Sequence, residues 1–181
     1  MAASLTSEES FAGWGIRTVA ADARRYNPMS YHNGSIWPHD NSLIAAGFVR
    51  YGLETETRKI LTGLLDASLF FDLHRLPELF CGFARRAGEA PTLYPVACSP
   101  QAWAAGAVLL IFQSVLGFTI SGRERRVVFA RNTLPDFLDE VIIRQLQVGD
   151  ASVDLVIARR NGQVSVSVPR KSGDLEVVVY R

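Results

Sequence analysis

One glutamate is a candidate for acid–base chemistry, because its neighbours along the chain are apolar. Glu78 lies within the sequence Leu-Pro-Glu-Leu-Phe-Cys-Gly over residues 76–82. Apolar surroundings disfavour the charged form of a carboxyl group and raise its pKa, which is one way to tune a general acid or base. A glutamate that faces solvent from a loop is an equally common arrangement, and these residues leave both interpretations open.

A second candidate region, from Trp14 to Asn41, interleaves aromatic and polar side chains among turn-forming residues. A pyranose ring offers apolar C–H faces for stacking and hydroxyl groups that need fixed hydrogen-bond partners, so this mixture suits sugar recognition. The alternative is an aromatic plug over the ends of helices, with the polar groups bonded to loop backbone.

Metal and disulfide chemistry are not predicted. His32, His39 and Asp40 match no metal-ligand spacing, so we expect hydrogen-bonding histidines, no metal site and no cofactor. The two cysteines, Cys81 and Cys98, are too few for a disulfide framework and too far apart for a Cys-x-x-Cys motif. Reduced thiols and a cytoplasmic location fit this usage.

The secondary structure that must position these residues is predicted to be helical in the first part of the chain and strand-rich in the second. We expect a helix over residues 41–51 with Asp40 as its N-cap, and a second over 54–71 with apolar residues at helical spacing. A third, apolar on nearly every side, begins at Ser99-Pro100 and ends near residue 116. Residues 1–39 are predicted to be ordered but irregular, with at most a short helix over 7–12.

After the third helix the sequence is dominated by β-branched residues that alternate with polar residues, a pattern typical of strands. The pair Asn161-Gly162 is a strong signal for a hairpin turn. The predicted strands are 117–121, 125–131, 141–148, 152–159, 163–169 and 174–180. We therefore expect a helical domain over residues 1–116 and a small antiparallel β domain over 117–181.

Composition narrows the classes of partner. The chain has 181 residues, with 19 Lys and Arg against 18 Asp and Glu, for a net charge of +1. This balance argues against binding to nucleic acid or to an anionic membrane. At 48% hydrophobic and 20% charged residues the chain is globular rather than disordered. Its most apolar stretch, 102–116, is too short to span a bilayer, and the N-terminus does not read as a secretion signal.

Several blocks, in order along the chain, resemble the bacterial glycogen-debranching, amylo-α-1,6-glucosidase-like members of the six-hairpin glycosidases. The blocks are residues 14–18, 26–41, 77–82 and 94–106, and the tail at 134–138 and 146–155 is similar to the C-terminal β extension of those proteins. The resemblance implies an (α/α)6 toroid. With the predicted elements it gives an α+β fold: a partial toroid of helical hairpins with long loops, followed by a small antiparallel β unit.

The resemblance also implies roles for individual residues. Glu78 takes the place of the general base, and the acid partner of such enzymes lies in an earlier half of the barrel. Asp40 is the nearby carboxylate that could replace that acid, although its expected helix-cap position favours a structural role. The residues expected to bind the sugar are Trp14, Arg17, His32, Asn33, Trp37, His39 and Trp103.

The predicted function is that of a carbohydrate-active protein, a C-terminal fragment of a glycogen-debranching-like glycoside hydrolase acting on α-1,6 bonds of α-glucans. Inverting hydrolysis needs two carboxyl groups, and only one is assigned with ease, so we expect the chain alone to be inactive. Its expected partners are an oligosaccharide or α-glucan and an upstream catalytic half or a second copy of the chain. A non-catalytic carbohydrate-binding or scaffold protein is the alternative.

Overall fold

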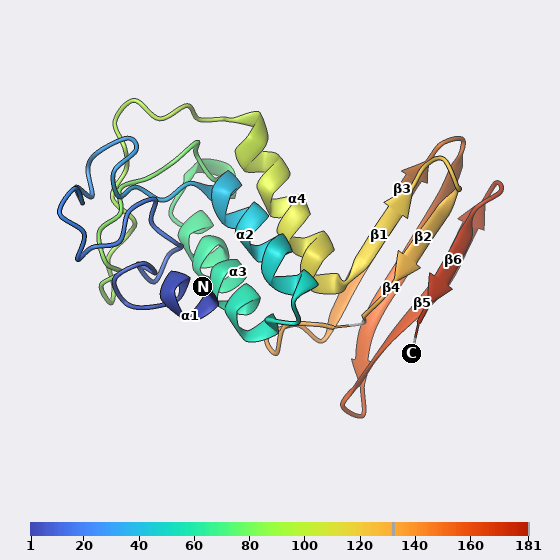
Figure 1. Cartoon of the computed structure of the whole chain (residues 1–181). Coiled ribbons are helices and arrows are strands. Elements are labelled where there is room, and N and C mark those ends of the chain that lie inside the picture. Colours follow the sequence, from blue (N-terminus) through green and yellow to red (C-terminus); the bar gives the residue numbers. More distant parts are fainter. Residues whose placement is uncertain (132, 181) are drawn as a thin grey trace. The chain divides into compact units, whose positions relative to one another are not determined.

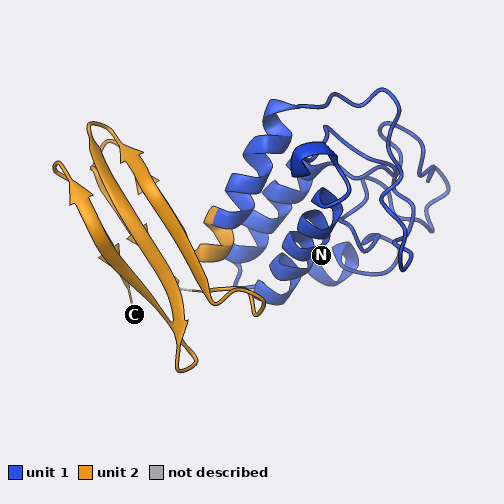
Figure 2. Cartoon of the chain, turned by 180° about the vertical axis from the view of Figure 1, so that it is seen from behind, with its two compact units in different colours: residues 1–112 blue, residues 113–181 orange. Residues whose placement is uncertain are grey.

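The computed structural model describes residues 1–131 and 133–180, which divide into two compact units with different architectures. The first unit is Met1–Phe112 and the second is Gln113–Arg181 (Figure 2). Helices and long loops build the first unit, and strands dominate the second (Figure 1). The α+β class predicted from the sequence agrees with this architecture. No helix among the described residues is both long and apolar enough to cross a membrane.

The first unit holds a pair of consecutive helices joined by a tight turn. Its helices are α1 (Ala2–Leu5), α2 (Pro38–Arg50), α3 (Glu54–Ser68), the 3-10 turn η1 (Asp72–His74) and the start of α4 (Ala102–Leu116). Gly52 has φ +72° and follows the cap residue of α2. The N–H groups of Gly52 and Leu53 donate to the carbonyls of Val49 and Phe48, which is the Schellman arrangement, so the predicted stop at Gly52 is confirmed.

The helix starts differ from the prediction. Asp40 is not an N-cap: α2 begins at Pro38, and Asp40 lies exposed in its first turn with Trp37 at the cap position. Proline is well suited to the first helical position because its missing N–H would have no intrahelical partner there. Residues 7–12, where at most a short helix was predicted, contain turns instead, and the short helix α1 lies nearer the N-terminus. Helix α3 ends at Ser68 rather than at residue 71.

The core of the first unit is apolar and comes from all three long helices. The buried side chains include Ala45, Phe48, Ile60, Leu61, Leu64, Ala67, Ala104, Ala107 and Ile111. Helix α4 is apolar nearly all round, as predicted, but only part of its circumference is covered within the described residues. Leu109 is 73% exposed and Trp103 is 40% exposed.

Short backbone bridges tie the irregular segments of the first unit together. Ile36 forms antiparallel bridges with both Arg17 and Phe80, so segments far apart in the sequence lie side by side. A glycine is required where they cross. A Cβ atom on Gly82 would lie 1.6 Å from the carbonyl oxygen of Gly34, closer than any two such atoms can approach. These crossings bring residues 14–41 against the loop that carries Glu78.

The second unit consists of two three-stranded sheets. Its strands are β1 (Phe118–Ser121), β2 (Arg126–Phe129), β3 (Glu140–Val148), β4 (Ala151–Arg160), β5 (Gln163–Ser172) and β6 (Glu176–Val179). One sheet has the order β3-β4-β5 and is antiparallel throughout, and its β4–β5 hairpin turns at Asn161-Gly162 as predicted. Buried side chains from both sheets form the core of the second unit, among them Phe118, Val127, Phe129, Val153, Leu155 and Ile157.

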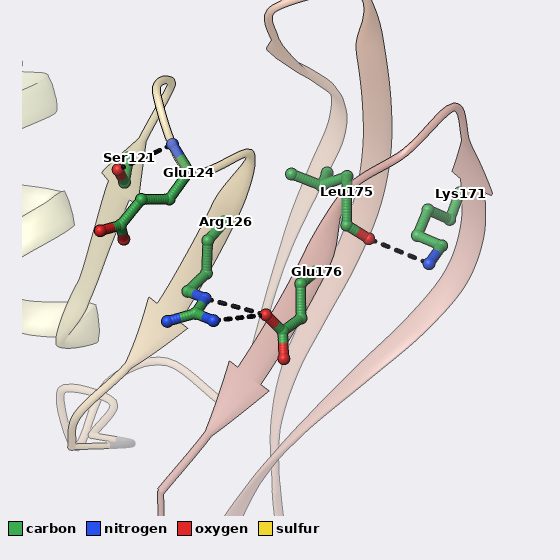
Figure 3. A network of polar contacts seen from close by, with 6 residues as sticks. All are labelled: Ser121, Glu124, Arg126, Lys171, Leu175 and Glu176. Atoms are coloured by element: carbon green, nitrogen blue, oxygen red, sulfur yellow. Dashed lines mark hydrogen bonds and ion pairs between the residues drawn. The ribbon is translucent and has the colours of Figure 1, made fainter.

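The other sheet, with the order β1-β2-β6, corrects the expectation of a purely antiparallel unit, because β2 and β6 pair in parallel. Arg126 and Glu176 are opposite each other in this pair, and the guanidinium Nε donates to the glutamate Oε2 at 2.9 Å (Figure 3). Lys171 Nζ donates to the carbonyl of Leu175 at 2.9 Å beside it. The strands are 50 residues apart along the chain, so local patterns carry no sign of their direction.

Candidate active site

Glu78 is buried in the first unit, with 8% of its surface exposed, and each of its carboxylate oxygens accepts a hydrogen bond. The Tyr31 hydroxyl donates to Oε1 at 2.7 Å, and the backbone N–H of Cys98 donates to Oε2 at 3.2 Å. The Glu78 N–H in turn donates to the Cys98 carbonyl at 2.9 Å. Two loops therefore fix this side chain from opposite ends of its carboxylate.

The direction of the Glu78 pKa shift corrects the expectation drawn from its apolar neighbours. The hydrogen bond from Tyr31 lowers the pKa of Glu78 below its ordinary value; burial acts against this, and the Cys98 N–H supports it. The partner shifts the other way, because the same hydrogen bond raises the pKa of Tyr31 to about 12. Glu78 is thus held as a carboxylate near neutral pH, which suits a base and not an acid.

An aromatic cluster surrounds the phenol that holds Glu78. We use this name for Tyr31, His32, Trp37, His39, Tyr94 and Trp103. The Tyr31 ring meets Trp37 edge to face at 4.7 Å and Tyr94 at 5.7 Å. Trp37 meets Trp103 edge to face at 5.6 Å, so the rings form one connected set of contacts. The cluster gathers four of the seven sugar-binding candidates: His32, Trp37, His39 and Trp103.

The cluster has a buried side and an exposed side. Trp37 is only 6% exposed, and its indole N–H donates to the Ser35 hydroxyl at 2.9 Å, which is the plug arrangement. Trp103 is 40% exposed, with His39 stacked on it at 4.8 Å and 16° between the planes. His32 is exposed and lies parallel to Trp37. The plug interpretation thus describes Trp37, whereas the exposed rings keep the sugar-binding interpretation as a prediction.

Two candidates bind other parts of the protein. Arg17 is buried, and its Nε donates to the Gly82 carbonyl at 2.7 Å while Nη1 donates to the carbonyls of Glu8 and Glu9. Trp14 is also buried, with the Arg85 guanidinium 4.3 Å above its ring. In this structure both side chains hold loops together and neither belongs to the aromatic cluster.

The polar candidates Asn33 and Asp40 lie at the periphery. The Asn33 backbone closes the preceding turn, accepting from the Asn27 N–H at 2.7 Å. Asp40 is exposed, and among the described residues its carboxylate has no hydrogen bond or ion pair. The geometry therefore offers no contact that joins Asp40 to Glu78.

Sequence reasoning left two residues of this region without a role. Tyr31 holds Glu78, and Asn41 is fully buried, with its amide Oδ1 accepting from the Ile16 N–H at 2.7 Å and Nδ2 donating to the Ile16 carbonyl at 3.0 Å. Both belong to the 26–41 block. Nothing in local spacing indicates a phenol–carboxylate contact across 47 residues.

An open cavity of about 540 Å³ lies beside the loop that carries Glu78. The cavity is lined by residues around η1 and the start of α4: His74, Arg75, Leu76, Pro100, Gln101, Ala102, Ala104, Ala105 and Val108. Its volume lies in the range of small-molecule sites. Within residues 1–131 and 133–180, no group of three or more His, Cys, Asp or Glu side chains could hold a metal ion.

Comparison with protein families gives an independent indication of class. Residues 1–74 match the Mannosylglycerate hydrolase MGH1-like glycoside hydrolase domain. The match takes in most of the aromatic cluster and ends four residues before Glu78. No curated protein matches the chain. The family match over residues 1–74 supports a carbohydrate-active, glycoside hydrolase-like protein.

Proposed function

We propose that the first unit forms part of the active site of a glycoside hydrolase, with Glu78 as the general base. The observation that carries this proposal is a buried carboxylate with a lowered pKa, held beside an aromatic cluster with an exposed tryptophan. The family match over residues 1–74 supports the same class. The base takes a proton from water, the water oxygen attacks the anomeric carbon, and the glycosidic C–O bond breaks toward the leaving group.

The leaving oxygen must be protonated by a second carboxyl group, separated from the base by roughly 6.5–9.5 Å in inverting enzymes. Glu78 is the only buried carboxylate among the described residues, and Asp40 is exposed without a contact to it. We infer that the acid comes from a segment outside this chain. The first unit would then be part of an (α/α)6 toroid over residues 1–116, with residues 117–181 as its β extension, and the exposed apolar side of α4 would face a further helix.

The substrate we propose is an α-glucan with α-1,6 branch points, on the resemblance of the sequence blocks to debranching enzymes. The matched family is named for mannosylglycerate hydrolase, so mannosylglycerate is the competing substrate. Trp103 supplies an apolar face of the kind on which a sugar ring stacks. The cavity of about 540 Å³ at the start of α4 has room for a monosaccharide unit, but neither Glu78 nor a ring of the aromatic cluster lines it.

A non-catalytic carbohydrate-binding protein is the second candidate. An exposed aromatic face, together with one buried carboxylate rather than two within residues 1–131 and 133–180, favours it. In that case the hydrogen bonds to Glu78 would only hold the loops of Tyr31 and Cys98 in place and would have no catalytic role.

Glu78→Gln tests the catalytic role in the longer protein that supplies the acid. Turnover is expected to fall at least ~100-fold, the usual scale for an acid–base group. Glu89→Gln is the matched control, because Glu89 is exposed and its nearest cation, Arg86, is 3.6 Å away. In Glu78→Ala, azide is expected to restore glycosyl transfer, because azide attacks without losing a proton. Unchanged turnover in Glu78→Gln would reject the assignment.

Substrate choice is tested with the chain itself. Maltooligosaccharides, branched dextrin and mannosylglycerate are titrated while tryptophan fluorescence is recorded, since Trp103 is the most exposed indole. We expect binding of the glucans and no release of glucose from this chain alone. Binding of mannosylglycerate alone would replace α-glucan by mannosylglycerate as the proposed substrate.

A further inference from the structure

We propose that Tyr31 is the positioning residue of this site: its hydroxyl group orients the Glu78 carboxylate and sets its readiness to take a proton from water. The inference rests on the proposed role of Glu78 as the general base. It adds a residue that lay outside the candidates drawn from the sequence.

The hydroxyl of Tyr31 is itself held in place. The Tyr31 carbonyl accepts hydrogen bonds from the Ser35 hydroxyl at 2.6 Å and from the Trp37 indole N–H at 3.2 Å. The ring packs edge to face against Trp37 and Tyr94. Backbone and ring are thus both fixed, so the donor reaches Glu78 in one geometry and little ordering remains to be done when substrate binds.

The two hydrogen bonds to Glu78 leave its carboxylate one orientation. Tyr31 occupies one lone pair of Oε1, and the Cys98 N–H occupies one of Oε2. Rotation about the terminal side-chain bond would break both bonds. A carboxylate oxygen has two lone pairs, so it can accept a second hydrogen bond, from water or from a neighbouring donor such as the Gln101 amide, beside the two described.

Hydrogen bonds, rather than a cation, keep this carboxylate ionised. The groups that act on it are the Tyr31 phenol, the Cys98 backbone and thiol, and the Gln101 amide. No Arg, Lys or His forms an ion pair with Glu78 in the described part of the chain. The largest of the effects that lower its pKa is the Tyr31 hydrogen bond. Removing that single hydroxyl is therefore the perturbation to which Glu78 should respond most.

Tyr31→Phe tests the inference on the 181-residue chain, without any need for turnover. The side-chain carboxyl of Glu78 is titrated by NMR in wild type and variant, with its signal assigned from Glu78→Gln. We expect the Glu78 midpoint to move to higher pH in Tyr31→Phe, because one donor to the charged form is lost while burial remains. Tyr26→Phe is the matched control: it removes a hydroxyl that donates to the Gly82 carbonyl at 2.9 Å, and the Glu78 midpoint should not move.

Equal Glu78 midpoints in wild type and Tyr31→Phe would overturn the inference. Should Tyr31→Phe fail to fold, the phenolate absorbance of the wild-type chain gives a second measurement. One tyrosine should titrate at about 12, and its titration near the ordinary value of 10 would equally overturn the inference.

Turnover in the longer protein separates this inference from the proposed function. We expect Tyr31→Phe to move the acidic limb of the kcat/KM profile to higher pH, in step with the Glu78 midpoint, and to lower kcat by about tenfold, the scale of a hydrogen bond to a charged group. If Glu78→Gln abolishes turnover and Tyr31→Phe leaves the profile unmoved, the positioning role fails alone. If Glu78→Gln retains turnover, the proposed function fails even where the NMR shift is found.

Discussion

Asn41→Ala should destabilise the first unit strongly, although Asn41 touches neither Glu78 nor the exposed rings in any described contact. Its amide accepts from the Ile16 N–H at 2.7 Å and donates to the carbonyls of Ile16 at 3.0 Å and Trp37 at 2.9 Å. These bonds join the start of α2 to the preceding loop. The site therefore depends on this amide through the placement of its loops.

The size of the effect follows from which groups lose their partner. The Trp37 carbonyl keeps the hydrogen bond from the Asn41 backbone N–H at 3.1 Å, which alanine preserves. The N–H and carbonyl of Ile16, a buried residue, are left without the amide. An unsatisfied buried polar group costs about 1–3 kcal/mol, so two should lower the free energy of unfolding by about 2–6 kcal/mol. That is a large part of the whole stability of a typical domain.

Urea unfolding followed by tryptophan fluorescence measures this effect in the correct unit, because Trp14, Trp37 and Trp103 all lie within Met1–Phe112. Asn27→Ala is the matched control. Its side chain is exposed and accepts one bond from the Met29 N–H at 3.0 Å, so we expect a loss under about 1 kcal/mol. Equal losses for Asn41→Ala and Asn27→Ala would refute the reasoning.

Three further predictions concern the same unit. Gly82→Ala should cost at least about 3 kcal/mol, measured by urea unfolding, because its Cβ would overlap the Gly34 carbonyl and force the two loops apart. Trp37→Ala should cost about 3–5 kcal/mol because the ring is buried, and a loss of sugar binding with full stability retained would contradict this. Stability should fall as pH drops from the ordinary value of 4.5 through the lowered pKa of Glu78, and Glu78→Gln should remove this part of the acid dependence.

The sequence predicted the elements whose signals are local. Helical spacing over α3, the stop at Gly52 and the hairpin turn at Asn161-Gly162 each depend on residues within a few positions of one another, and the structure contains all of them. Helix ends were predicted less well. At α2 the competing signals Asp40 and Pro38 lie two residues apart, and the proline sets the start.

Features that join distant segments could not be predicted in the same way. The parallel direction of β2 and β6 depends on a pairing across 50 residues, between Arg126 and Glu176. The pKa of Glu78 is the sharper example. Its neighbours in sequence predict a raised value, but the groups that decide the direction come from Tyr31, 47 residues earlier, and from the Cys98 backbone. Apolar neighbours along a chain thus do not define the polarity around a side chain.

Residues that look suited to ligands can instead serve to place other residues, as several of those in the 14–41 region do. The polar atoms of Arg17 and Asn41 form hydrogen bonds with backbone groups of the loops. These bonds hold the 14–41 region against the loop that carries Glu78. Tyr31 reaches Glu78 only because that contact is fixed. Trp103 is the most exposed tryptophan of the cluster and is therefore the ring that a sugar would meet in the proposed site. A motif of aromatic and polar residues therefore marks the neighbourhood of a site, while exposure and hydrogen bonding decide which of its members can touch a substrate.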